Sequence, residues 1–261
     1  MADFIYSMPN IVLFCLISSI AVIISIIGVC IVNRFVSLKD RYEENGVMGY
    51  IGGTITIIYT IVAGFTILYV YDNFNKSKEA VQQEASIITN LYRYSTKLTN
   101  PLRTQIQTEL KNYLLFVKNT EWILMQQGKE ISDKGDIIID KMTRMIDTYQ
   151  AKHDTHEQAA IDDLSKEFNL LYSARETRIL LANSALRSDI WLVLTIGLFF
   201  SIAVNYFFGM RFWYHIFSII GIAIITSAIF FLIMELDRPF RGEFSVTSEP
   251  LDTTLNRIKK M

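Results

Sequence analysis

A chain of 261 residues with 51% hydrophobic side chains and a mean hydropathy of +0.29 is too apolar for an ordinary soluble domain. Its formal net charge of −1 gives no electrostatic basis for binding nucleic acid. Of its 51 acidic and basic residues, 33 lie between positions 72 and 189, so charge is concentrated in one central segment. These features predict an integral membrane protein with a polar central segment.

Four stretches contain no Asp, Glu, Lys or Arg: residues 11–32, 47–71, 190–210 and 212–234. About 20 helical residues, each rising 1.5 Å, cross the roughly 30 Å hydrocarbon core of a bilayer. Each stretch is therefore predicted to be a transmembrane helix that contacts lipid. The first lacks the basic start of a signal peptide and is too long for one, so we expect it to stay in the protein.

The four spans divide the chain into a first transmembrane pair (1–71), a cytoplasmic helical domain (72–189), a second transmembrane pair (190–234) and a cytoplasmic tail (235–261). An even number of spans places both termini and the domain on one side of the membrane. Seven Lys and Arg lie near the span ends on that side, against four on the other. Positive charge favours the cytoplasmic side, so both termini are predicted to be cytoplasmic and the protein to be multi-pass in a plasma membrane.

The middle segment is predicted to be helical almost throughout, because it has one Pro, two Gly and no sustained period-two alternation. The second span should continue as one long helix to about Leu98. Asn100 is predicted to cap the next helix, with Pro101 as its first residue and Gly128 as its stop signal. A last long helix from about Ile161 is expected to run without a break into the third span. The fold class is therefore all-α, with a helical bundle continuous with four spans.

Signals for enzyme chemistry are absent. The sequence has no phosphate-binding glycine loop, nucleophile elbow or zinc-protease helix, so we expect neither an enzyme nor a cofactor. His153 and His156 stand at a spacing that metals accept, but nothing in sequence completes a site, and we expect no metal. Four glutamates on predicted amphipathic helices are interpreted as surface carboxylates: Glu79, Glu84, Glu109 and Glu121.

The second span carries the most informative pattern. Gly49 and Gly53 are one turn apart, which favours close helix packing over a pore-facing role. One face carries an apolar stripe that turns polar where the helix leaves the membrane, as the wall of a water-filled vestibule would. The stripe comprises Ile57, Ile61, Phe65 and Leu68, and the polar continuation comprises Asp72, Lys76 and Glu79. The neighbouring face, with Thr56 and Thr60, is the rival pore-lining surface.

Two segments carry a resemblance to a known family. The stretch TIVAGFTILYVYDNFNKSKE resembles the pore helix of bestrophins, and DRPFRGEFSV with the later EPLDTTLNRI resembles the segment after their last span. The chain is most similar to the bacterial bestrophin-like domain family, with its Asp-Arg-Pro-Phe-x-Gly ending (residues 237–242). Glu-Ala in the first cytoplasmic helix (84–85) and Glu-Trp in the second (121–122) also match, and the correspondence runs in order over residues 47–256.

The resemblance implies a homo-oligomeric channel for small ions, pentameric in known bestrophins, in a bacterial inner membrane. Carried over by position, Ile57, Ile61 and Phe65 would form the hydrophobic neck, and Asp72, Lys76 and Glu79 the vestibule beside it. The acidic cluster that binds calcium in bestrophins is missing, because Glu243 is followed by Phe-Ser-Val. Calcium gating is therefore not implied, and ion selectivity is not transferred.

The end of the last span groups four charges around a Pro: Glu235, Asp237, Arg238 and Arg241. Pro239 should end the helix at or before Arg238. The simpler interpretation is that these charges anchor the membrane interface, with Asp237 and Arg238 or Arg241 pairing with the long cytoplasmic helices. The alternative is gating, with Glu235 or Asp237 sensing an ion or a proton.

Two functions fit these patterns. The favoured one is a bestrophin-like oligomeric ion channel with a neck formed by the second span. The alternative is a non-conducting, membrane-anchored helical sensor or scaffold. A transporter is disfavoured, because no acidic or basic residue lies within a span.

Overall fold

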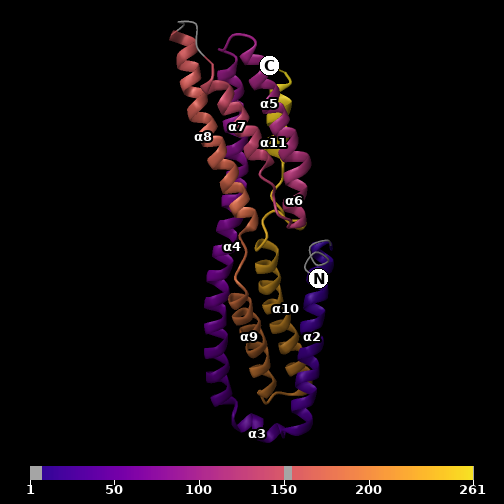
Figure 1. Cartoon of the computed structure of the whole chain (residues 1–261). Helices are drawn as coiled ribbons and strands as arrows, with labels where there is room; N and C mark the ends of the chain where they lie inside the picture. The colour runs from indigo at the N-terminus through magenta and orange to yellow at the C-terminus, as the bar shows by residue number, and fades with distance from the viewer. Residues whose placement is uncertain (1–7, 150–154, 261) are drawn as a thin grey trace. The chain divides into compact units, whose positions relative to one another are not determined.

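A computed structural model describes residues 8–149 and 155–260 of the chain, and all regular structure in these ranges is helical. Two compact units share the chain. Unit 1 comprises residues 1–72, 185–238 and 242–244, and unit 2 comprises residues 73–184, 239–241 and 245–261. The helices are labelled in Figure 1.

Unit 1 contains the predicted spans. Its helices are α2 (Asn10–Phe35), the short α3 (Leu38–Glu43), the first part of α4 (Asn45–Ser95), α9 (Ser188–Ala203) with the 3-10 turn η2 (Val204–Phe207), and α10 (Phe212–Leu236). Four helical stretches are long and apolar enough to cross a membrane, and each overlaps one of the four charge-free windows, the third of which extends past the helix end at Phe207. The prediction of an all-helical protein with four transmembrane helices is confirmed, and the chain is a multi-pass membrane protein.

Small and polar residues let the helices of unit 1 approach closely. The hydroxyls of Ser18 in α2 and Ser227 in α10 lie 3.0 Å apart. At Gly197 in α9, an added methyl group would lie only 2.6 Å from the ring of Tyr59 in α4, so this crossing needs a residue without a side chain. Such contacts matter in a bilayer, where lipid tails compete equally for apolar surface.

Unit 2 is a helical bundle built on the second part of α4. Its other helices are α5 (Leu102–Phe116), the π turn η1 (Val117–Glu121), α6 (Trp122–Gln127), α7 (Lys134–Asp147), α8 (Thr155–Asn183) and α11 (Glu249–Ile258). Apolar side chains at helical spacing, such as Ile106, Leu110 and Leu164, fill its core. Gly128 ends α6 with a left-handed φ of 62°, which confirms the predicted stop signal.

The long second helix is also confirmed, because α4 is one 51-residue helix that runs from unit 1 into unit 2. Two details differ from prediction. The helix α5 begins at Leu102, one residue later than expected, with Pro101 at its cap. The expectation of an unbroken helix into the third span is wrong, because residues 184–187 separate α8 from α9.

Candidate functional site

The predicted neck residues lie on the exposed face of α4 in the single chain. Ile57, Ile61 and Phe65 are 53–71% exposed, and Leu68 on the same stripe is 64% exposed. The opposite face is buried, with Tyr59 and three others packed inside unit 1: Ala63, Thr66 and Val70. Helix α4 therefore uses one face to hold unit 1 together and presents the other, a broad apolar surface, outward.

The glycines of α4 differ in how closely they pack within the chain. A methyl group added at Gly53 would meet no atom of the described residues within 4 Å, so the Gly49–Gly53 pair does not form a close contact within the chain. The tight position is Gly52, where an added methyl would lie 3.3 Å from Val204. On the rival face, the Thr60 hydroxyl donates to the Thr56 carbonyl oxygen at 2.8 Å, so this hydroxyl is satisfied within its own helix.

The three vestibule candidates are exposed and follow the stripe along α4. Asp72 ends the unit 1 part of the helix, while Lys76 and Glu79 belong to unit 2. In a helix, positions 61, 65, 68, 72 and 79 recur on one face. The outward face of α4 is thus apolar over the predicted span and polar beyond it.

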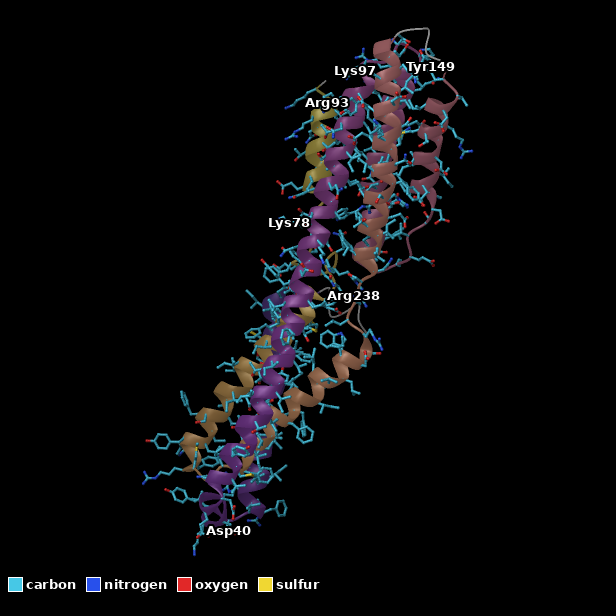
Figure 2. The ribbon with its side chains drawn as sticks, turned by 90° about the vertical axis from the view of Figure 1, so that its left-hand side faces the viewer. Asp40, Lys78, Arg93, Lys97, Tyr149 and Arg238 are labelled. Atoms are coloured by element: carbon cyan, nitrogen blue, oxygen red, sulfur yellow. The ribbon has the colours of Figure 1, made fainter. Side chains whose placement is uncertain are left out.

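Asp237 caps the end of α10 and accepts a hydrogen bond from the backbone N–H of Leu186 at 2.6 Å. This bond ties the 184–187 connection to the last span, and Arg238 lies further away, with its Nε 3.9 Å from the carboxylate. Burial raises the pKa of Asp237, against the opposing influence of the Leu186 N–H. Helix α10 ends at Leu236, which confirms the stop signal of Pro239. Figure 2 labels Arg238 and Asp40 at opposite ends of unit 1.

A second acidic group lies nearby in unit 1. Glu235 is 3% exposed, and its Oε2 atom has no hydrogen-bond partner among the described residues. Glu243 is a second carboxylate in the same neighbourhood, and it accepts a hydrogen bond from the backbone N–H of Asn10 at 3.0 Å. A buried carboxylate near another carboxylate is suited to hold a proton.

The fourth charged residue of the predicted group, Arg241, belongs to unit 2, where its guanidinium lies against Gly128.

Unit 2 contains a buried ionic cluster that the sequence analysis missed. Glu84 and Glu121 were interpreted as surface carboxylates, and that interpretation is wrong, because both are 0% exposed. Arg178 in α8 joins them: its Nε donates to Glu84 Oε2 at 2.5 Å and its Nη2 to Glu121 Oε2 at 2.6 Å. Tyr113 completes this part of the cluster by donating its hydroxyl to Glu84 Oε1 at 2.6 Å.

Arg175, one turn before Arg178, extends the cluster to α7. Its Nη2 donates to Glu121 Oε1 at 2.8 Å and to the Ser132 carbonyl oxygen at 3.1 Å, and its Nη1 pairs with Asp136. A methyl group added at Gly135 would lie 2.7 Å from Glu121 Oε1, so only glycine leaves room for the pair. The buried ionic cluster thus links α4, α5, η1, α7 and α8.

One feature of the fold and one of the sequence point to this cluster. The π turn η1 ends at Glu121, and one-turn π segments are frequent at functional sites because they redirect a side chain. Glu84 and Glu121 are also the glutamates of the Glu-Ala and Glu-Trp pairs that carried the family resemblance. Burial, with the Glu84 charge beside it, raises the pKa of Tyr113 well above its usual range.

The structure brings together no group of three His, Cys, Asp or Glu that could hold a metal within residues 8–149 and 155–260. His153 and the side chain of His156 lie outside the described residues, so the prediction made for this pair is untouched. Cys15 and Cys30 are free thiols on α2.

Comparison with known proteins gives two findings. The model of the Bestrophin-like domain family matches residues 19–251. Crystal structures of a bacterial bestrophin homolog from Klebsiella pneumoniae share the fold at low identity. One point mutant has a TM-score of 0.72 and 15% identity over 95% of this chain and 98% of that chain. Another has a TM-score of 0.70 and 15% identity over 95% and 96%. A search of curated proteins found no match.

Proposed function

This chain belongs to the bestrophin-like family, and from that premise we propose that it is an oligomeric ion channel with a hydrophobic neck formed by Ile57, Ile61 and Phe65 of α4. The observation that carries the proposal is the position of this stripe. It lies on the face of α4 turned away from the rest of unit 1, in a helix whose outward face becomes polar beyond the span.

Assembly is part of the proposal, because four helices in one chain leave the stripe uncovered. A homo-oligomer with α4 of each copy nearest the symmetry axis would bring the stripes together around a central path. Five copies are expected from the family resemblance. The exposed small residues Gly53 and Gly64, beside which an added methyl would meet nothing within the described chain, support a close approach of neighbouring copies.

A ring of Ile and Phe side chains would form a dry constriction. Apolar walls a few ångströms apart cannot replace the hydration shell of an ion, and such pores gate by dewetting. Widening the ring lowers the cost of hydrating it, so conduction should rise when a neck side chain is shortened.

The test is ion flux in liposomes reconstituted with purified protein. We expect Ile61→Ala and Phe65→Ala to raise monovalent ion flux by about tenfold, a change that corresponds to about 1.4 kcal/mol in the hydration barrier. Val62→Ala, on another face of α4, and Ile225→Ala, an exposed isoleucine of α10, are the controls and should stay near the wild-type flux.

If neither neck variant passes monovalent ions of either sign, while the protein remains oligomeric, the channel is excluded and the scaffold replaces it. Equal gains from the neck variants and from Ile225→Ala would mean that flux reports general leakiness.

The orientation is a further part of the proposal: both termini and unit 2 in the cytoplasm, with the membrane being a bacterial inner membrane. In a background without Cys15 and Cys30, a single cysteine at the exposed Asp40 should react with an impermeant external reagent. A cysteine at the exposed Lys129 of unit 2 should react only after the membrane is opened. The reverse pattern would overturn this orientation.

A further inference from the structure

A polar groove lies within unit 2 between α4 and α11. It has a volume of about 520 Å³ and is lined by one face of α4 from Lys78 to Asn90 and by α11 from Glu249 to Arg257. The Thr254 hydroxyl donates to the Ala85 carbonyl oxygen at 3.3 Å and fixes the two helices side by side. Figure 2 shows α11, in yellow, beside the stretch of α4 between the labelled Lys78 and Arg93.

The two helices run in the same direction in Figure 1, which orders the groove from end to end. Lys78 and Glu249 lie toward one end, and Asn90 and Arg257 toward the other. Opposite charges face each other only at the Lys78 end. The Arg257 end has no carboxylate among its lining residues.

The groove is lined by two cationic side chains and one carboxylate. Lys78 and Arg257 make no ion pair within 4.0 Å with any described carboxylate, and the side chains of three neutral lining residues make no hydrogen bond within the described ranges. The three are Gln82, Ser86 and Thr253. Against these donors stands one carboxylate, Glu249. A volume whose lining includes two cations, together with the amide and two hydroxyls of these three neutral residues, fits an anion with several oxygens, since a guanidinium binds such anions through paired N–H bonds.

We propose that the α4–α11 groove is a binding site for a phosphate-type oxyanion, held by Arg257 and Lys78 with Gln82, Ser86 and Thr253 as additional donors. The groove lies wholly within unit 2, so the site does not depend on the neck or on conduction. It would make unit 2 a receptor for a phosphorylated ligand of the cytoplasm or for a lipid phosphate.

The probe is labelled pyrophosphate, measured by equilibrium dialysis against the full-length protein in nanodiscs of zwitterionic lipid at low ionic strength. We expect saturable binding that weakens as salt rises. Arg257→Gln and Lys78→Gln should each weaken it about fivefold or more, and the double variant should abolish it. Glu249→Gln removes the one opposing charge and should tighten binding about twofold. Lys166→Gln, an exposed lysine of α8 outside the groove, should change nothing.

No saturable binding up to about 5 mM pyrophosphate would overturn the proposal, as would binding that the double variant leaves unchanged. A second arm adds anionic lipid to the nanodiscs. If lipid phosphate is the occupant, that lipid should displace pyrophosphate, whereas a free cytoplasmic ligand predicts no displacement. Flux measurements on the same preparations separate a failure of this site from a failure of the channel.

Discussion

The two units of the chain differ in the side chains that they expose and in the charged groups that they bury. Unit 1 turns large apolar groups outward, as Ile11 at 78%, Phe35 at 82% and Phe217 at 81% exposure illustrate. Unit 2 packs its apolar side chains inside, and within that core it buries two guanidinium groups, Arg175 and Arg178, with the carboxylates of Glu84 and Glu121. Helix α4, with 51 residues, contributes to both units, so both patterns of exposure and burial occur along a single helix.

The difference follows from the solvent that each unit requires. In lipid, an apolar exterior costs nothing, and helices are held by small residues and hydroxyl contacts such as Ser18 with Ser227. In water, the exterior can be charged, and buried charges are tolerated only when they are paired and hydrogen-bonded. A buried charge cluster contributes little net stability, but removing one member leaves the others unpaired. The comparison therefore predicts which single substitutions destabilise the protein most.

Arg178→Met should produce the largest loss of stability. It leaves the buried carboxylates of Glu84 and Glu121 without their shared partner, which should lower the free energy of unfolding of unit 2 by about 3–5 kcal/mol. Thermal unfolding can be followed through Trp122, which is buried against Phe240 in unit 2, in a background where Trp191 and Trp213 are phenylalanine.

Two further variants decide whether pairing is the cause. Lys166→Met, on the exposed face of the same helix, should change stability by less than about 0.5 kcal/mol. Adding Glu84→Gln to Arg178→Met should recover part of the loss, because it removes one of the unpaired charges. A loss of less than about 1 kcal/mol in the free energy of unfolding for Arg178→Met would contradict this account, since unit 2 would then tolerate unpaired buried charge.

The junction at Asp237 should respond less strongly. Asp237→Ala leaves the Leu186 N–H without its acceptor and should cost about 1–3 kcal/mol. Asp237→Asn keeps an acceptor oxygen and removes a charge that burial disfavours, so its loss should be smaller. Thermal melting and size-exclusion chromatography measure both. An activation curve that shifts in Asp237→Asn at unchanged stability would favour gating over anchoring.

Much of unit 1 could be predicted because a bilayer imposes a simple requirement. Absence of charge over 21 to 25 residues located all four spans, and absence of a breaker after Tyr71 predicted the long α4. Gly128 and Pro239 marked helix ends through local geometry alone. The exposed stripe of α4 also followed from periodicity, although its role stays a proposal.

The missed features depend on tertiary contacts. Nothing in Ser184 to Arg187 breaks a helix, and the connection is held open where Leu186 donates to Asp237, a partner 51 positions away. The buried ionic cluster did leave a signal: Glu84 lies in phase with the buried Val81 and Ile88. A charge on an apolar face needs a partner, but which arginine supplies it cannot be read from one helix.

The smallest expected effect is the loss of stability that Tyr113 causes at high pH. Its folded-state pKa is raised well above 10, because burial disfavours the charged phenolate and because ionisation would place a second negative charge beside Glu84. The unfolded tyrosine loses its proton near pH 10 while the folded one keeps it, so the folded state binds more protons above that pH. Stability should therefore fall by up to about 1.4 kcal/mol per pH unit above pH 10 from this group alone.

Tyr113→Phe should be less stable than wild type at pH 7, because Glu84 loses a hydrogen bond, yet the difference in stability between the two proteins should narrow as pH rises above 10. Trp122 fluorescence melts at pH 7 to 11 measure that gap, and subtraction of the two curves cancels the titration of lysines common to both proteins. A gap that stays constant across this range would show that Tyr113 titrates normally and that the cluster is open to water.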